Sequence, residues 1–335
     1  TRMGLQQVFE MRVPMHAAVS ETVELARKVL GESKASFVNA LLRKVSAKSL
    51  EEWLAPVALL GDEVSRLAIT YSHPEWIVSA YFDLLRDFDE VRSLLEANNT
   101  PAKPTFVAWP GRSEISEFEE WGAVQTTFSP YGFRADVTPS ALEAVRHRRA
   151  GVQDEGSQLV ASVFAQAAAE KSSWLDLCAG PGGKAALLSS IALQGDHRFV
   201  ANEISQIRAD LVKQVVGSHE VWVGDAREIS TRGEGFDAIL ADVPCTGMGA
   251  LRRRPEVRWR RSLSDLRELG VLQREISDAA ISILNIGGVF GYATCSPHLA
   301  ETSIAVADIL KKHPELEQID IQPFMPLGLE GGVRD

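Results

Sequence analysis

The chain is poor in cysteine: it has three in 335 residues, and none belongs to a CxxC pair or to a cysteine and histidine cluster of zinc type. An odd number of cysteines without framework spacing argues against a disulfide scaffold. The sequence also lacks a recognisable signal peptide and any apolar run that approaches the roughly 20 residues of a membrane span. These absences predict a globular protein with no metal and no membrane partner, for which a reducing cytoplasm is the natural location.

Positive charge is not in excess over the whole chain, whose formal net charge is −10. This argues against a protein whose entire surface attracts nucleic acid. Six arginines nevertheless lie between residues 252 and 261, offset only by Glu256. Taken alone, such a stretch is most simply a solvated loop, but a basic stripe beside a reactive site can hold phosphates. Its position directly after the motif that contains Cys245 favours phosphate binding.

Residues 1–60 predict a small helical unit. Apolar residues recur at helical spacing over residues 14–30 and again over 37–45. Residues 31–36 are the expected break between the two helices.

Residues 61–150 have a mixed pattern and predict a small α+β domain that contacts RNA. An amphipathic stretch over 77–85 indicates a helix, and residues 105–109 indicate a strand.

From residue 151 to the last residue, 335, strand and helix patterns alternate regularly. This alternation predicts an α/β fold with a mostly parallel, doubly wound sheet that helices cover on both faces. The predicted strands are 173–177, 198–201, 220–223, 238–241 and 289–292. The predicted helices are 184–192, 206–216, 265–284 and 301–312. Polar motifs that follow such strands are expected to meet at one edge of the sheet.

A glycine-rich turn after the first of these strands indicates a nucleotide-type ligand, because glycines let the backbone turn tightly and approach a ligand closely. About 20 residues further on, Glu203 ends the next strand, at the spacing where an acid binds ribose hydroxyls. Asp225 ends the third strand, where it is placed to accept from an adenine amino group. The turn has neither GxGxxG nor GxxxxGK[ST], which leaves S-adenosylmethionine as the favoured cofactor. The residues predicted to bind it are Cys178, Ala179, Gly180, Pro181, Gly182, Gly183, Lys184, Glu203, Asp225 and Asp242.

Two cysteines follow later strands of the same sheet. Cys245 lies in Asp242-Val-Pro-Cys-Thr-Gly247, and Cys295 lies in Ala293-Thr-Cys-Ser-Pro297. Two thiols beside a nucleotide-type pocket suggest covalent catalysis on an electron-poor ring. Either thiol could be the nucleophile, since motif spacing does not decide between them. The third cysteine, Cys178, is expected to be a small buried apolar residue.

Three motifs together resemble the signatures of the Nop/Sun-type RNA cytosine-5 methyltransferases: Asp176-Leu-Cys-Ala-Gly-Pro-Gly-Gly-Lys184, Asp242-Val-Pro-Cys-Thr-Gly247 and Thr294-Cys-Ser-Pro297. The resemblance extends to residues 153–157, to Arg254-Pro-Glu256 and to the marker His73-Pro-x-Trp76. Residues 37–43 are similar to the end of the NusB-like helical domain of the RsmB (Sun, Fmu) branch, which modifies small-subunit ribosomal RNA. Residues 1–60 are therefore expected to be a partial NusB-like helical segment that binds RNA.

The resemblance implies a methyltransferase that uses S-adenosylmethionine to modify carbon 5 of a cytosine in 16S ribosomal RNA. It assigns Cys295 as the nucleophile that adds to carbon 6 and Cys245 as the residue that helps expel the product. Asp242 is expected to hold the cytosine amino edge or the methionine end of the cofactor. The implied partner is ribosomal RNA or a partly assembled small subunit, and the expected state is a monomer. The residues predicted to contact RNA are Arg252, Arg253, Arg254, Arg258 and, by stacking on a base, Trp259.

Two other functions stay open at this point. A DNA cytosine-5 methyltransferase shares the chemistry, but it should carry a large target-recognition insert after the catalytic strands, and none is visible. A ribosome-assembly scaffold with incidental methylation is the second alternative. The intact cysteine and cofactor motifs argue against a loss of catalysis.

Overall fold

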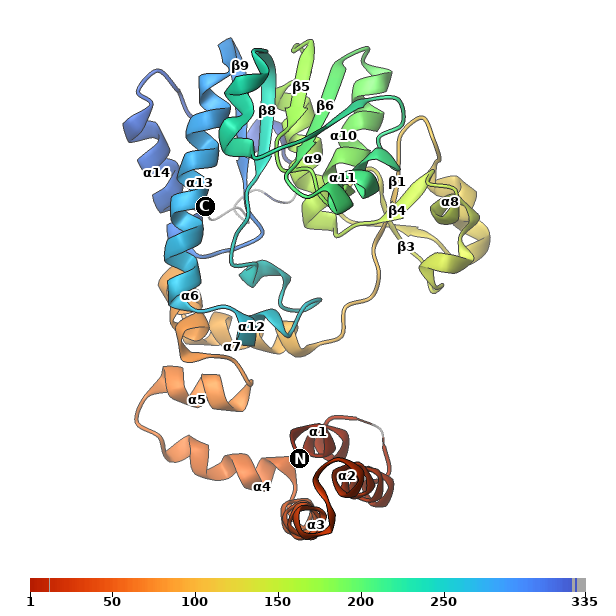
Figure 1. Ribbon diagram of the computed structural model, residues 1–335, viewed down its shortest axis with the longest axis vertical. Coiled ribbons are helices and arrows are strands. Elements are labelled where there is room, and N and C mark those ends of the chain that lie inside the picture. The colour runs from red at the N-terminus through yellow and green to blue at the C-terminus, as the bar shows by residue number, and fades with distance from the viewer. Residues whose placement is uncertain (12, 327–328, 330–335) are drawn as a thin grey trace. The chain divides into compact units, whose positions relative to one another are not determined.

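The computed structural model describes residues 1–11, 13–326 and 329 (Figure 1). The chain divides into two compact units, Thr1–Val78 and Ser79–Asp335, with the division inside helix α6 (Glu75–Leu85). The predicted three-part division at residues 60 and 150 stays a prediction, and residues 330–335 of its last part lie outside the described residues.

The first unit is helical, as the sequence predicts. Its elements are α1 (Arg2–Phe9), α2 (Met15–Leu30), α3 (Glu32–Ser46), α4 (Leu50–Leu54), the 3-10 helix η1 (Ala55–Leu59) and α5 (Glu63–Thr70). A small core joins α2 and α3 and contains Val23, Ala26, Ala35, Val38 and Leu42.

The predicted break over residues 31–36 is longer than the observed one. Gly31 alone separates α2 from α3, since its φ of 85° is one that glycine adopts readily. Ala35, inside the predicted break, is fully buried in the core. Helix α3 therefore begins five residues earlier than expected because its first turn packs against α2.

The second unit continues α6 and adds α7 (Phe88–Asn99) and a small antiparallel sheet of order β2-β3-β1-β4. The strands are β1 (Phe106–Ala108), β2 (Val124–Gln125), β3 (Gly132–Arg134) and β4 (Ala150–Val152), with η2 (Ile115–Trp121), η3 (Pro139–Ala141) and α8 (Glu143–Arg146) between them. The rings of Phe106, Phe118 and Phe133 stack in its core. The helix predicted over 77–85 and the strand predicted over 105–109 are both present.

The larger sheet has five parallel strands in the order β7-β6-β5-β8-β9, which confirms the predicted α/β fold class. Its strands are β5 (Ser173–Asp176), β6 (Arg198–Glu203), β7 (Glu220–Val223), β8 (Phe236–Asp242) and β9 (Leu284–Ala293). The connecting helices are α9 (Glu155–Ala167), α10 (Gly183–Gln194), α11 (Gln206–Lys213), η4 (Ala226–Arg232), η5 (Met248–Ala250), α12 (Val257–Arg260), α13 (Leu263–Ser282), η6 (Leu299–Glu301), α14 (Ser303–Lys312) and η7 (Gln322–Phe324).

Strand residues alternate between two hydrophobic cores, as the twofold side-chain period of a strand requires. Trp174 packs with α9 and α10 on one face, whereas its neighbour Leu175 packs with η4 and α13 on the other. Figure 1 shows the helices that cover the sheet. The chain turns in opposite directions from β5, first to β6 and later to β8. In such sheets this switch point is where ligands bind, outside the carboxyl ends of the strands.

Candidate active site

The glycine-rich turn lies at the centre of this edge, between the end of β5 and the start of α10. The backbone N–H of Gly180 donates to Glu203 Oε2 at 3.0 Å. A Cβ at position 180 would lie 2.2 Å from the same oxygen, so only glycine allows this approach. The turn and the strand-end acid predicted from their spacing are therefore in direct contact.

Glu203 and Asp225 end β6 and border β7, but each already has protein partners. Glu203 is buried, and its Oε1 accepts from the backbone N–H of Ser205 at 2.8 Å and lies 2.5 Å from Arg208 Nη2. Asp225 caps η4 and binds the guanidinium of Arg227 at 2.6 Å, and this contact holds the pKa of its carboxyl below the usual range. Their predicted roles toward ribose and adenine stay predictions.

Asp176, at the end of β5, is the site residue that the sequence analysis did not single out. Its side chain is 1% exposed, and within the described residues no side chain forms a hydrogen bond with either carboxylate oxygen, although the nearby backbone N–H of Cys178 lowers its pKa. Burial and, after it, the nearby charge of Asp242 raise its pKa to about 7, and the charge of Lys184 opposes them. A buried, unpaired carboxyl group is costly unless a ligand satisfies it. The site therefore fits a ligand that brings a positive charge to Asp176, as S-adenosylmethionine would. Its position as the strand-end acid before the glycine turn was the available signal.

The loops after β8 and β9 bring two thiols together. The sulfurs of Cys245 and Cys295 are 3.2 Å apart, although the residues are 50 positions apart in the sequence. Cys245 is the more buried of the two, and burial disfavours the charged form. We therefore place the shared proton on Cys245, which donates it to the Cys295 sulfur.

The two thiols differ in acidity as a result. The hydrogen bond from Cys245 lowers the pKa of Cys295 to about 7; burial and Asp242 oppose this, and Lys184 supports it. The same hydrogen bond, burial and the negative charges of Cys295 and Glu301 raise the pKa of Cys245. The exposed thiol is therefore the one that ionises near neutral pH.

An ion pair connects the cofactor turn with the thiol pair. Lys184, at the start of α10, donates to Asp242 Oδ2 at 2.8 Å and to Ser157 Oγ at 3.3 Å. Asp242 ends β8, three residues before Cys245. By contrast, the thiol of Cys178 packs against the apolar core under the sheet, and burial raises its pKa. Cys178 has the apolar surroundings that the sequence predicts.

Two of the predicted RNA-contacting residues, Arg252 and Arg253, bind other parts of the protein, and two more, Arg254 and Trp259, are exposed. Arg252 donates to the backbone oxygen of Thr100 at 3.0 Å, and Arg253 forms an ion pair with Asp154. Arg254 is exposed, and the Trp259 side chain is 63% exposed.

Arg258 corrects the sequence prediction. It is only 4% exposed, and its Nη1 donates to Asn99 Oδ1 at 2.9 Å. A side chain that is buried and hydrogen bonded to α7 offers little surface to RNA, so in this structure Arg258 holds its loop in place. Sequence could not separate it from its exposed neighbours because they share one short arginine-rich stretch.

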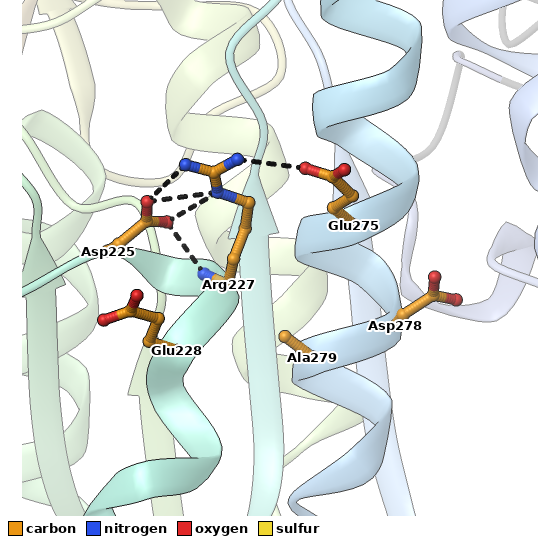
Figure 2. A pocket seen from close by; sticks show the side chains of 6 residues that line it. All are labelled: Asp225, Arg227, Glu228, Glu275, Asp278 and Ala279. Carbon is orange, nitrogen blue, oxygen red and sulfur yellow. Dashed lines mark hydrogen bonds and ion pairs between the residues drawn. The ribbon is translucent and has the colours of Figure 1, made fainter.

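A surface hollow between η4 and α13 touches this site only through Asp225. It is lined by Asp225, Arg227, Glu228, Glu275, Asp278 and Ala279. Figure 2 shows Arg227 between the carboxylates of Asp225 and Glu275. Across the described ranges, no group of three or more histidine, cysteine, aspartate or glutamate side chains could hold a metal ion, and no helix is long and apolar enough to cross a bilayer.

A five-stranded parallel sheet, a glycine turn after its central strand and carboxylates at the neighbouring strand ends define a Rossmann-like methyltransferase fold. Residues 163–335 match the family of 16S rRNA methyltransferases RsmB/F, and residues 2–47 match the NusB family. The chain belongs to the 16S rRNA methyltransferase RsmB/F family.

Relatives match nearly the whole chain. The putative methyltransferase Rv1407 of Mycobacterium tuberculosis is 42% identical over 96% of this chain and 72% of its own length. Ribosomal RNA small subunit methyltransferase B of Vibrio cholerae is 32% identical over 96% of this chain and 75% of its own length.

Two solved structures share the fold. The crystal structure of PH0851 has a TM-score of 0.76 at 21% identity and covers 93% of this chain and 72% of that one. The crystal structure of NSun6 from Pyrococcus horikoshii with SFG has a TM-score of 0.60 at 18% identity and covers 71% of this chain and 87% of that one.

Proposed function

We propose that this protein transfers a methyl group from S-adenosylmethionine to carbon 5 of a cytosine in 16S ribosomal RNA, through a covalent adduct with Cys295. The observation that carries the proposal is the thiol pair: two sulfurs 3.2 Å apart, of which the more exposed has a pKa lowered to about 7. A methyltransferase whose target atom is already nucleophilic has no need of a thiolate. Carbon 5 of cytosine needs one, because the ring must first be activated.

The cofactor site supports S-adenosylmethionine. Gly180 and Glu203 form the turn against which its adenosine part would lie, and Asp176 offers the unpaired buried carboxyl group that suits a cation. When bound there, S-adenosylmethionine supplies an electrophilic methyl group. The NSun6 structure with SFG is a fold relative with a ligand and is consistent with a small-molecule site in this fold.

Cys295 begins the proposed reaction. Its thiolate adds to carbon 6 of the cytosine, so a sulfur–carbon bond forms and the double-bond electrons become available at carbon 5. After carbon 5 has gained the methyl group, it also carries one proton. Loss of that proton to a base restores the double bond and expels Cys295 as a thiolate, which leaves 5-methylcytosine.

Cys245 assists the last step by its position. Its S–H hydrogen bonds to the Cys295 sulfur, and a donor at 3.2 Å stabilises negative charge on that sulfur. This favours both the attacking thiolate and the departing one. Without Cys245, elimination should slow more than addition, because elimination releases the thiolate that this donor stabilises, whereas addition consumes it.

The target base must leave its stack to reach both the thiol and the methyl group, which favours a single-stranded or loop cytosine. Arg254 and Trp259 offer a guanidinium and an indole on the exposed side of the loop that follows Cys245. An arginine that binds phosphate beside an aromatic ring that stacks on a base is a common arrangement for single strands.

The test compares wild type, Cys245→Ala, Cys295→Ala and the double variant. Each is incubated with S-adenosylmethionine and unmodified small-subunit ribosomal RNA, and methyl transfer is measured beside covalent adducts on a denaturing gel. Cys245→Ala should accumulate an adduct, whereas Cys295→Ala and the double variant should form none. The opposite pattern would exchange the two roles.

Two further arms separate the alternatives. A DNA duplex of the same sequence should accept no methyl group, and methylation of that duplex would favour the DNA methyltransferase. A Cys295→Ala protein that still supports small-subunit assembly in cells would favour the scaffold. If wild type neither forms adducts nor transfers methyl groups, the proposed activity is wrong.

A further inference from the structure

Glu301 is a buried carboxylate that the proposed reaction does not yet use. It ends η6, six residues after Cys295, and its side chain has no exposed surface. Its Oε1 accepts from the backbone N–H of Thr246 at 2.9 Å and from Gln273 Nε2 at 3.0 Å, and its Oε2 accepts from the Thr246 hydroxyl. A carboxylate removed from water needs several donors, and the loop that carries Cys245 provides two of them.

The same contacts connect the two cysteine loops. The hydroxyls of Thr246 and Ser296, each adjacent to a cysteine, are 3.0 Å apart. The backbone N–H of Gly249 donates to the carbonyl of Cys295 at 2.8 Å. Gln273, which donates to Glu301, also donates to the carbonyl of Pro244 at 2.9 Å. The residues that flank Cys245 on both sides are therefore fixed through Glu301 and its partners.

We infer that Glu301 is a positioning residue for the thiol pair: it holds the Cys245 loop against the Cys295 loop and keeps the shared proton on Cys245. This role rests on the proposed function in that it assumes Cys295 is the nucleophile. Glu301 itself contacts neither sulfur and acts through Thr246 and through its charge.

Charges around the pair agree with this role. Lys184 from α10 and Asp242 from β8 face Cys295 with opposite signs, and their effects on its pKa oppose each other. Glu301 faces Cys245 and raises its pKa, in addition to the larger effects of the Cys295 hydrogen bond and burial. Tyr292 from β9 and His298, whose pKa values burial raises and lowers respectively, remain uncharged neighbours near pH 7. Glu301 thus adds a negative charge on the Cys245 side of the pair, whereas Asp242 and Lys184 act on the Cys295 side.

The decisive experiment measures thiol reactivity without RNA or cofactor. Wild type and Glu301→Gln are treated with iodoacetamide between pH 5.5 and 9, and the alkylation rates of Cys245 and Cys295 are determined by peptide mass spectrometry. In wild type, Cys295 should react with a midpoint near its pKa of about 7 and Cys245 should be almost inert. Glu301→Gln should lower the ratio of Cys295 to Cys245 alkylation about ten-fold, the effect of one pKa unit.

Glu170→Gln is the matched control, because it removes the same charge from an exposed position. It should leave the ratio unchanged. A Glu301→Gln protein with the wild-type alkylation ratio and pH midpoint would overturn the inference, whatever its thermal stability. A purely structural glutamate would change the melting temperature but not the relative reactivity of the two thiols.

Thr246→Val provides a second variant in case Glu301→Gln does not fold. It keeps the charge of Glu301 and removes the hydroxyl that connects Glu301 with Ser296. We expect kcat for methyl transfer to fall about ten-fold, with KM for RNA unchanged, as for a misplaced reacting group. An unchanged kcat would contradict the positioning role. Wild-type methyl transfer tests the proposed function separately, and the alkylation ratio remains measurable even if that activity is absent.

Discussion

The carboxyl edge of the parallel sheet differs between its two halves. Strands β5 and β6 end on the carboxylates Asp176 and Glu203, and Asp225 follows β7, whereas the loops after β8 and β9 carry the thiols Cys245 and Cys295. A further carboxylate, Asp242, ends β8 and is paired with Lys184. In the first half, Asp176 is buried without a side-chain partner among the described residues. In the second, the residues beside each cysteine are hydrogen bonded to one another and to Glu301.

The proposed function accounts for this difference. A half that receives a ligand leaves a polar group unpaired, which costs stability until the ligand arrives. A half that holds two reactive atoms within a short distance of each other must fix their neighbours, because small displacements reduce the rate of a positioned reaction.

The largest effect on methyl transfer is expected in the half of the sheet edge after β8 and β9, which carries Cys245 and Cys295. Cys295→Ala should reduce methyl transfer by about four orders of magnitude or more, the scale seen when an enzyme loses its covalent nucleophile. Single-turnover transfer of labelled methyl groups to RNA measures the loss, and cofactor affinity measured by calorimetry should stay at the wild-type value. A Cys295→Ala protein with more than a tenth of wild-type turnover would erase the proposed distinction between the two thiols.

In the half of the sheet edge formed by β5, β6 and β7, a substitution of Asp176 should weaken cofactor binding but raise the stability of the unliganded protein. Asp176→Asn should weaken S-adenosylmethionine binding about 10- to 100-fold, because a hydrogen bond to a charged group is lost. The same change should stabilise the unliganded protein by about 1–2 kcal/mol above pH 7. Calorimetric titration and thermal melting measure the two effects.

The sign of that stability effect depends on pH. The folded-state pKa of Asp176 is raised to about 7, so the folded protein keeps a proton that the unfolded chain releases near pH 4. The stabilisation of the folded wild-type protein by protonated Asp176 is therefore complete below about pH 4 and is lost as the pH rises through 7. Asp176→Asn should flatten this part of the melting profile. A wild-type and a variant curve that stay parallel from pH 4 to 8 would contradict the buried, unpaired state of the carboxyl group.

The pH dependence of turnover tests the thiol pair. Turnover limited by Cys295 ionisation should rise about ten-fold per pH unit below its pKa of about 7 and level off above it. Cys245→Ala removes the S–H donor, so the midpoint of Cys295 alkylation should rise toward about 8.5, the pKa of an ordinary thiol. A midpoint that stays near 7 in Cys245→Ala would show that Lys184 rather than Cys245 governs the ionisation.

The smallest effect is expected in the loop that follows Cys245. Arg254→Ala should weaken RNA binding a few-fold and reduce the salt dependence by about one phosphate contact. Arg258→Ala should instead lower the stability by about 1–3 kcal/mol, since it breaks a buried hydrogen bond to Asn99. Filter binding over a salt series and thermal melting distinguish the two variants. Equal effects of both on the salt slope would return Arg258 to the RNA-contacting group.

The local pattern of apolar and polar residues was enough to predict much of the fold. Each of the five predicted strands overlaps an observed one, because buried parallel strands are short apolar runs that glycines and polar residues interrupt. One helix start was less well predicted: α3 begins at Glu32 because Ala35 packs into a core that the local pattern does not reveal.

The sequence by itself determined the fold class, the glycine turn and the three motifs, since each of these depends on residues that are near one another in the chain. Only the tertiary structure decided that the two sulfurs lie 3.2 Å apart, that Arg258 is buried and that Glu301 joins the two cysteine loops. The physical reason is the length scale of these contacts. Thr246 and Glu301 are 55 residues apart and Arg258 and Asn99 are 159 apart, so their contacts depend on how distant segments pack and not on local pattern.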